Sequence, residues 1–199
     1  MKYPGPFLRL IESFKTLPGV GEKTALRMAL FVVENMEDES VQLFSDSLAK
    51  VKTDIHFCDK CHMMMETTCP ICEDPHRDHT TLMVVESVRE AIIIENSGSY
   101  QGLYHILGGK IDFSKGVEPG DLNIDSLFKR LDSIKEIILS LSGGVEGELT
   151  GSYISELLND KDIKLTRIAV GIPVGSDLSY ADKRTLTKAL DNRIVYKKE

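Results

Sequence analysis

The most chemically informative residues are four cysteines in two Cys-x2-Cys pairs, Cys58 with Cys61 and Cys69 with Cys72. Two such turns supply the four thiolates that a tetrahedral structural zinc ion prefers. Four protein ligands leave no open position for water, so the metal is expected to stabilise a small module and to take no part in hydrolysis. Two disulfides or a redox pair are the alternatives, which a reducing compartment disfavours. The nearby histidines are expected to lie outside the ligand set: His56, His62, His76 and His79.

A second group of residues lies near the N-terminus, where the segment Leu17-Pro18-Gly19-Val20-Gly21 precedes Lys23 and Arg27. Gly19 and Gly21 permit a tight turn between two helices, in which backbone N–H groups approach a phosphate at the start of the second helix. Lys23 and Arg27 are four residues apart on one helix face and would reach neighbouring phosphates. The pattern resembles the helix-hairpin-helix motif of DNA repair proteins, which holds the DNA backbone without reading its sequence. The alternative is an ordinary helical turn with solvated basic residues.

Three glutamates follow predicted strands. Glu86 comes directly after one apolar run, and Glu146 and Glu148 lie in the turn after a later one. Ligands of parallel sheets bind beyond the carboxyl ends of the strands, where three acids could hold Mg²⁺. The pattern resembles the Toprim domain of topoisomerases and primases, which has a glutamate after its first strand and an Asp-x-Asp pair after a later one. Here the pair is Glu146-Gly147-Glu148, a departure that argues against metal-dependent catalysis and leaves Mg²⁺ binding open. The alternative is that the glutamates are solvated, or that Glu148 begins a helix and interacts with its dipole.

Charge and composition limit the classes of protein to which the chain can belong. Its 199 residues carry 24 basic and 31 acidic side chains, and the net charge of −7 argues against a protein that coats nucleic acid over its whole surface. Residues 1–35 nevertheless carry +2, so the remaining 164 residues carry −9. The apolar fraction of 42 % is ordinary for a globular protein, and no window reaches the ~18 apolar residues of a membrane span. The chain begins without the apolar run of a signal peptide, so it is expected to be cytoplasmic.

The periodicity of apolar residues predicts helices first, and then alternating strands and helices. Residues 1–53 are expected to be helical around the turn at 17–21, with a third helix capped by Ser40 and packed through Val41, Phe44 and Leu48. The second helix is expected to face a core with Ala25, Met28, Ala29, Val32 and Val33. Beyond the cysteines, strands are predicted at 81–85, 136–141, 165–170 and 194–196, helices at 87–95, 124–131, 150–158 and 180–190, and a glycine-rich loop at 98–120. Such alternation implies right-handed crossovers and a mostly parallel sheet.

The predicted fold class is therefore α+β with an α/β body, divided into four parts. These parts are a helix-hairpin-helix DNA-binding region at 1–53, a four-cysteine zinc finger at 54–79, a Toprim-like domain with a mostly parallel sheet at 80–175, and a C-terminal helix and strand at 176–199.

The order of these parts resembles the RecR family of bacterial recombination mediators over nearly the whole chain. The resemblance is carried by residues 17–21 and 27–29, the four cysteines, Val85-Glu86, and residues 102–109, 145–148, 166–169 and 171–175. It implies a non-enzymatic protein that works with RecO and RecF to load RecA onto single-stranded gaps coated by single-strand-binding protein. It also implies a ring-like homotetramer, with Lys23 and Arg27 contacting DNA inside the ring. Glu146 and the neighbouring acids would then attract a basic protein partner.

Two other functions are compatible with parts of the sequence. A Toprim nuclease would act on nucleic acid with Mg²⁺, using Glu86 as general acid or base and Glu146 and Glu148 as metal ligands. The Glu-x-Glu pair and the lack of an evident nucleophilic tyrosine weigh against it. A zinc-stabilised scaffold that binds only proteins would not bind DNA at low salt. His105 has no nucleophile beside it in the sequence and is expected to be structural.

Overall fold

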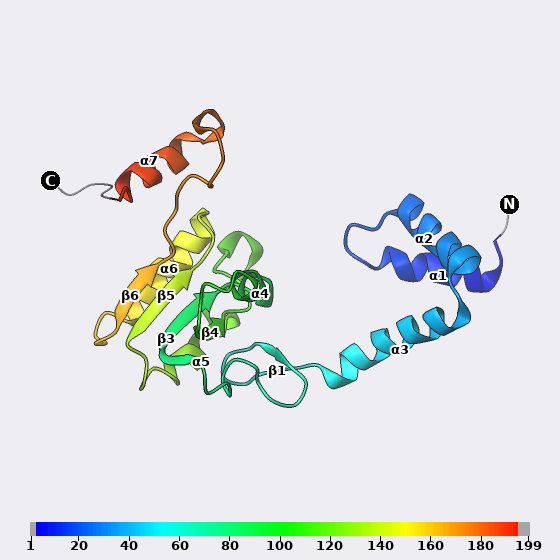
Figure 1. Cartoon of the computed structure of the whole chain (residues 1–199), viewed down its shortest axis with the longest axis horizontal. Helices are drawn as coiled ribbons and strands as arrows, with labels where there is room; N and C mark the ends of the chain where they lie inside the picture. Colours follow the sequence, from blue (N-terminus) through cyan, green and yellow to red (C-terminus); the bar gives the residue numbers. More distant parts are fainter. Residues whose placement is uncertain (1–2, 195–199) are drawn as a thin grey trace. The chain divides into compact units, whose positions relative to one another are not determined.

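The computed structural model describes residues 3–194, which divide into two compact units between Ile55 and His56 (Figure 1). The first unit is helical, and the second contains the cysteines, a parallel sheet and its covering helices. The predicted fold class, α+β with a mostly parallel sheet, is confirmed. None of the described helices is long and apolar enough to cross a membrane.

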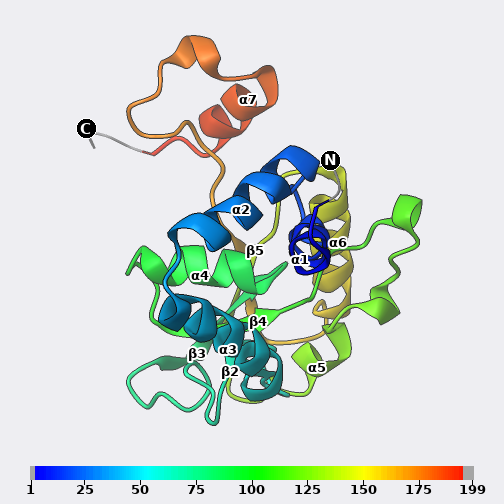
Figure 2. The same cartoon turned by 90° about the vertical axis from the view of Figure 1, so that its right-hand side faces the viewer.

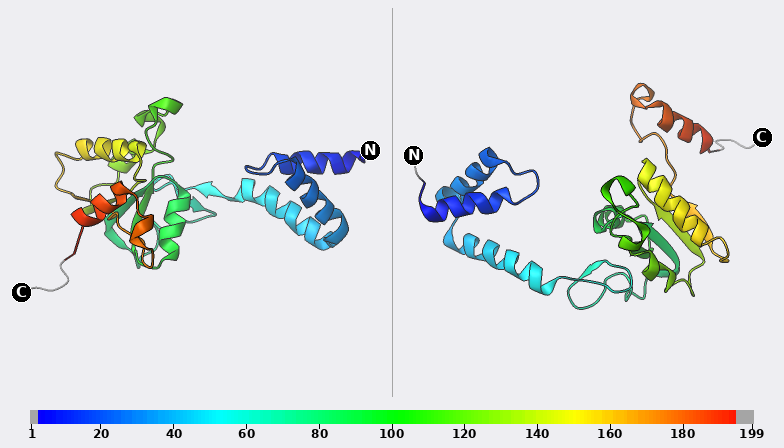
Figure 3. Two further views of the ribbon diagram at one scale, coloured as in Figure 1. Left: turned by 90° about the horizontal axis from the view of Figure 1, so that it is seen from above. Right: turned by 180° about the vertical axis from the view of Figure 1, so that it is seen from behind.

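The helical unit consists of α1 (Gly5–Lys15), α2 (Glu22–Asn35) and α3 (Asp38–Asp54). The turn at residues 17–21 joins α1 to α2, and the two helices pack on each other as a hairpin (Figure 3). Ile11 of α1 and the small residues Ala25 and Ala29 of α2 form its buried centre. The hairpin is therefore held by a short, closely packed apolar contact.

Two expectations for the helical unit are wrong. α3 begins at Asp38 after the N-cap residue Glu37, so Ser40 lies inside the helix and does not cap it. Most of the side chains expected to face a core are exposed instead, namely Met28, Val33, Val41, Phe44 and Leu48. Among the described residues, α3 buries no side chain at all. The apolar periodicity identified the apolar faces, but nothing within residues 3–55 covers them.

The second unit is built on four parallel strands in the order β4, β3, β5, β6 (Figure 1). They are β3 (Asp78–Val85), β4 (Gly102–Ile106), β5 (Glu136–Ser140) and β6 (Lys164–Arg167). β3 pairs with β5 without a register break, and Val85 lies opposite Ser140. The residues that follow Val85 and Ser140 therefore emerge side by side at the carboxyl edge of the sheet.

Strand β4 lies within residues 98–120, so the prediction of a loop over this whole segment is wrong. Gly102 and His105 interrupt the apolar pattern of the strand, and more glycines flank it. All five strand residues are nevertheless buried, and the His105 ring forms a hydrogen bond with the Asn123 carbonyl oxygen. Burial between neighbouring elements thus overrides a weak local propensity for strand.

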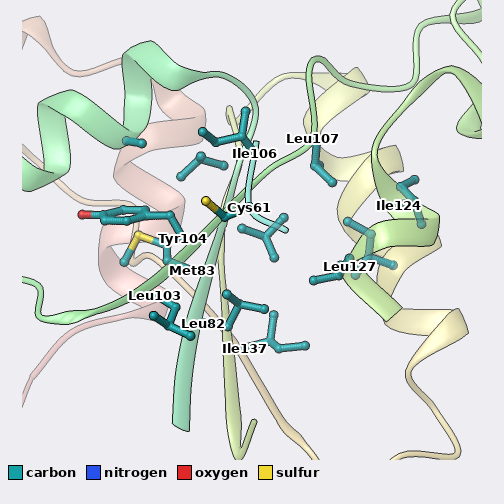
Figure 4. Packing of buried hydrophobic residues seen from close by; sticks show 14 of the residues in the cluster. Cys61, Leu82, Met83, Leu103, Tyr104, Ile106, Leu107, Ile124, Leu127 and Ile137 are labelled. Carbon is teal, nitrogen blue, oxygen red and sulfur yellow. The ribbon is translucent and has the colours of Figure 1, made fainter. Parts of the chain in front are cut away.

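Helices cover both faces of the sheet. They are α4 (Val88–Asn96) after β3, α5 (Ile124–Phe128) after β4 and α6 (Val145–Leu157) after β5. α4 lies on one side of the strands, with α5 and α6 on the other (Figures 2 and 4). Right-handed crossovers that run in opposite directions from β3 and β5 produce this arrangement. Leu82, Leu127 and Ile137 are fully buried between the layers (Figure 4).

Several predicted boundaries differ from the structure. α6 begins at Val145 where residue 150 was predicted, β6 ends at Arg167 where 170 was predicted, and α5 ends at Phe128 where 131 was predicted. Two short 3-10 helices, η1 (Phe113–Lys115) and η2 (Pro119–Asp121), lie between β4 and α5. The earlier start of α6 places Glu146 and Glu148 in the first turn of a helix.

The C-terminal segment contains the 3-10 helix η3 (Leu178–Tyr180) and the helix α7 (Lys183–Asp191). Asp182 caps α7, because its carboxylate accepts a hydrogen bond of 3.0 Å from the Thr185 N–H group. The helix predicted at 180–190 is confirmed with a later start. Ile194 lies in no strand, and the other two residues of the strand predicted at 194–196 lie outside the described residues.

Candidate metal centre and nucleic-acid interface

The four cysteines come together as one cluster beside the short antiparallel strands β1 (His56–Phe57) and β2 (Met64–Met65). Their Sγ atoms all lie within 4.8 Å of one another, and those of Cys61 and Cys69 are 3.4 Å apart. A tetrahedron of thiolates about 2.3 Å from a zinc ion has its sulfurs slightly less than 4 Å apart. Within the described residues the cluster contains four thiols and no imidazole. The residues present therefore fit a metal ion bound by four thiolates.

The surroundings of the cluster stabilise the thiolate form of one cysteine and destabilise that of two others. The Cys61 hydrogen bond and the Arg130 guanidinium, 3.6 Å from the Cys72 sulfur, lower the pKa of the Cys72 thiol to about 5. Burial raises the pKa of Cys69, and the hydrogen bond with Cys72 together with burial raises that of Cys61. Four ionised thiolates without a cation would repel one another in a buried site. A divalent cation removes this cost, because thiolates are the form that binds a metal.

Arg130 also attaches the cysteine segment to the sheet. Its Nη1 atom donates hydrogen bonds to the carbonyl oxygens of Lys60, at 3.1 Å, and Tyr104, at 2.9 Å. The Ile106 N–H group donates to the Cys61 carbonyl oxygen at 3.0 Å. The cluster and strand β4 thus form one packed body. Sequence reasoning missed Arg130, since nothing local distinguishes it from a solvated basic residue.

A buried histidine lies at the same junction. The Nε2 atom of His105 forms a 2.8 Å hydrogen bond with the Asn123 carbonyl oxygen, and its ring meets that of His62 edge-on at 5.4 Å. His62 is in turn hydrogen-bonded to the Ser126 hydroxyl at 2.8 Å. Burial lowers the pKa of His105 to about 4, so the ring is neutral at pH 7.

Because the His105 ring is buried in its neutral form, the free energy of unfolding is expected to fall at acidic pH. The unfolded chain binds a proton on His105 below about pH 6.5 and the folded chain only below about pH 4, so stability falls as the pH falls between these values, by about 3 kcal/mol in all. Urea unfolding at pH 7 and pH 5 measures the effect. His105→Gln keeps a donor for the Asn123 carbonyl and is expected to be less sensitive to pH. Equal pH dependence of the variant and the unchanged chain would contradict the assignment.

The predicted hairpin has the geometry of an anion site. Gly19 adopts a φ of +79°, which favours glycine, and Gly21 is the N-cap of α2. No side chain caps the first N–H groups of α2, so these donors are available to a ligand. Lys23 lies in the first turn of α2 and Arg27 one turn later, and both are exposed. The structure therefore brings together the four residues that the sequence proposed for DNA contact.

Arg27 has a second environment that the sequence did not indicate. Its side chain also lines an apolar groove of about 480 Å³, together with Phe14, Phe31 and Phe44. The aliphatic part of an arginine can pack on such a surface while its guanidinium remains in water. Arg27 thus lies where the phosphate-binding face predicted from the sequence meets an exposed apolar face of the helical unit.

The three glutamates do not form a shared metal site. Within residues 3–194, the cysteines are the only group of three or more His, Cys, Asp or Glu side chains close enough to hold one ion. Glu148 is paired with Arg167 at 2.8 Å and Arg184 at 3.3 Å, and the hydrogen bond from Arg167 lowers its pKa. Glu86 is bound to the Ser142 N–H group at 2.6 Å and faces Lys110. This arrangement does not fit a Mg²⁺ ion, whose oxygen ligands must be free to converge on it.

Comparison with known proteins agrees with this architecture. Residues 80–169 match the family model of the Toprim domain, residues 7–52 that of the RecR helix-hairpin-helix, and residues 171–194 that of the RecR C-terminal region. Recombination protein RecR of Bifidobacterium adolescentis is 46 % identical over 196 residues, which cover 97 % of this chain and 98 % of the relative. The resemblance noted in the sequence is thereby confirmed, and the chain belongs to the RecR family of recombination proteins.

Proposed function

We propose that the protein is a mediator of recombinational DNA repair, which binds DNA without sequence preference and acts with RecO and RecF to load RecA at single-stranded gaps. The observation that carries the proposal is the helix-hairpin-helix unit, where the uncapped start of α2 adjoins Lys23 and Arg27. Such a site binds phosphate through backbone N–H groups and two cations. Family membership connects this site with recombination.

The proposed DNA contact consists of Gly19, Gly21, Lys23 and Arg27. The glycines allow a phosphate to approach the backbone, and the cations neutralise the neighbouring phosphates. No part of this site presents a rigid pattern of donors and acceptors to base edges, so binding is independent of sequence. The acidic remainder of the chain disfavours DNA elsewhere on its surface.

The proposed metal is one structural zinc ion, bound by Cys58, Cys61, Cys69 and Cys72. Four thiolates in a buried, compact cluster match the preference of zinc and leave no position for a substrate. The proposed compartment is the cytoplasm, where thiols remain reduced and available to the metal. The zinc stabilises the junction with the sheet and has no catalytic role.

The proposed assembly is a ring-like homotetramer. Val33 of α2 and Leu43 of α3 are 66 % and 70 % exposed, and Phe31, Leu48 and Val51 are each more than half exposed. Apolar surface of this extent on a soluble chain is typical of a protein–protein interface. Four copies of a weak phosphate site on one DNA molecule would bind far more tightly than a single copy, because the later contacts become intramolecular.

The proposed role of the acidic edge of the Toprim domain is to bind a basic partner, RecO. Among the described residues, Glu146 has no ion-pair partner within 4.0 Å, whereas Glu86 and Glu148 face Lys110, Arg167 and Arg184. Glu146 is therefore the carboxylate at this edge best able to accept a cationic side chain from another protein. We propose no catalytic residue, and the pairing of Glu86 and Glu148 favours a binding role over Mg²⁺-dependent nuclease chemistry.

Light scattering after size exclusion tests the proposal with and without a gapped DNA duplex. The zinc-loaded chain is expected at four times its monomer mass, and the complex at that mass plus one duplex. The loading step is tested by adding RecO, RecF and RecA to gapped DNA coated with single-strand-binding protein, where omission of this chain is expected to slow RecA assembly. A monomer that leaves DNA free at low salt would overturn the DNA-binding and ring proposals together.

A further inference from the structure

Three side chains meet where β3 and β5 end. The Glu86 carboxylate accepts a 2.6 Å hydrogen bond from the Ser142 N–H group through Oε1, and its Oε2 lies 3.6 Å from the Lys110 Nζ atom. Lys110 also donates a 2.9 Å hydrogen bond to the Ser142 hydroxyl. These three residues form a closed triangle of contacts, which we call the edge clamp.

The edge clamp is partly buried and comes from three separate segments. The side chains of Glu86 and Lys110 are 17 % and 31 % exposed. Glu86 follows β3, Ser142 follows β5, and Lys110 belongs to the segment after β4. Charge-assisted hydrogen bonds in such a setting are shorter and stronger than those between exposed, neutral groups. The contacts therefore fix the relative positions of three strand ends.

The backbone around Lys110 is itself held against α6. The Ile111 N–H group donates to the Thr150 hydroxyl at 2.9 Å, and this hydroxyl donates to the Glu146 carbonyl oxygen at 2.7 Å. Ile111 and Thr150 are fully buried. These hydrogen bonds hold the backbone beside Lys110 in place. From this anchored position, the Lys110 side chain extends to Ser142 and contacts it with its ammonium group.

The first turn of α6 packs tightly against the clamp. A Cβ atom placed on Gly147 would lie 2.0 Å from the Ser142 carbonyl oxygen. Real side chains do not approach a carbonyl oxygen so closely, so only glycine fits at position 147, and the Ser142 carbonyl group lies directly against the backbone of α6. A movement of Ser142 toward α6 would therefore displace the first turn of the helix, which carries Glu146 and Glu148.

We propose that Lys110 is the resident cation of this Toprim edge. Its ammonium group pairs with the Glu86 carboxylate and holds the start of α6 in place. A divalent ion is therefore not needed at this edge of the sheet. Mg²⁺ requires several oxygens about 2.0–2.1 Å away in octahedral geometry. It would have to displace Lys110 from Glu86 to use this carboxylate as a ligand. Lys110 is thus a positioning residue for the acidic edge, and it acts on Glu146 through Ser142 and Gly147.

Hydrogen–deuterium exchange of the zinc-loaded full chain tests the positioning role. Lys110→Met keeps the length of the side chain and removes the charge, so amide exchange in residues 142–150 is expected to become roughly tenfold faster. Lys110→Arg is expected to restore protection. The matched control is Lys129→Met, which removes an exposed lysine of the same unit. It should leave amide exchange in residues 142–150 unchanged. Protection in Lys110→Met equal to that of the unchanged chain would overturn the proposal.

A second measurement tests the claim about the cation, and its first part uses only the unchanged chain, so it does not depend on the stability of a lysine variant. Exchange of residues 142–150 in the unchanged chain is expected to be the same in millimolar MgCl₂ and in NaCl of equal ionic strength. In Lys110→Met, Mg²⁺ is expected to recover part of the protection, and this recovery should disappear when Glu86→Gln is added. Protection of the unchanged chain by Mg²⁺ that is lost in Glu86→Gln would overturn the proposal, as would a Lys110→Met variant that does not respond to Mg²⁺.

Discussion

Replacing Cys61 by serine is expected to release the metal and to lower the melting temperature by about 10 °C or more. Cys61 is fully buried, and its carbonyl oxygen holds Ile106 of strand β4. Structural zinc sites contribute on the order of 10 kcal/mol to folding, so the loss of one of four ligands removes a large part of the stability of this junction. Metal content by mass spectrometry of the native protein and melting by circular dichroism measure the two effects.

The control for the zinc prediction is a histidine beside the cluster. His76→Gln changes an exposed residue that lies outside the four-thiol group, so one zinc ion per chain should remain. Treatment of the unchanged chain with a chelator should reproduce the Cys61→Ser melting curve, and added ZnCl₂ should reverse it. Full zinc content in Cys61→Ser, or disulfides in the unchanged chain, would show that the proposed ligand set is wrong.

Reversing the charge of both Lys23 and Arg27 to glutamate is expected to weaken DNA binding by roughly 100-fold at low salt. Each residue is expected to neutralise one phosphate, so the double variant should also lower the salt dependence of binding by about two contacts per site. Because both side chains are exposed, the helical content should not change. Fluorescence anisotropy with a labelled duplex over a series of KCl concentrations measures affinity and slope together.

The matched control is a second pair of basic residues in the same unit. Lys50→Glu with Lys52→Glu changes the net charge by the same amount on the exposed surface of α3. Its affinity should fall much less than that of the Lys23 and Arg27 variant. Equal losses of affinity in the two double variants would mean that DNA binding depends on the total charge of the unit and not on a specific contact at the start of α2.

The parts that could be predicted from the sequence are those specified by local patterns. The turn at residues 17–21, the start of α2 near Glu22 and strands β3 and β5 all follow from glycine positions and apolar periodicity. The proximity of the four thiols follows from their spacing, because each Cys-x2-Cys turn places two sulfurs together. In these regions local propensity and the final fold agree.

The missed elements are those in which local propensity opposes the fold. Strand β4 contains Gly102 and His105, and only the surrounding core makes this segment extended and buried. The first turn of α6 contains Gly147, a poor helix former that is required there by the approach of the Ser142 carbonyl oxygen. The exposure of Leu48 on α3 shows that periodicity identifies an apolar face but not what covers it.

The side-chain contacts of basic residues at the candidate sites could not be predicted, because they connect residues that are distant in the chain. Lys110 reaches Ser142, Arg130 reaches the Cys72 sulfur, and Arg167 reaches Glu148. Each contact depends on the strand order and on the crossover connections. The residue types at Glu86 and Glu148 suggested metal ligands, and only the fold reveals that cations of the protein already occupy them.

The uncapped start of α2 has a consequence for how the protein would find its place of action. The proposed contact, made of backbone N–H groups and two cations, would have nearly the same energy at every step along a duplex, so a bound molecule would slide without being held at particular sequences. Such a contact would hold the protein on DNA without locating a particular position. Under the proposed function, the position would have to be specified by the shape of the gap and by the proteins already bound there.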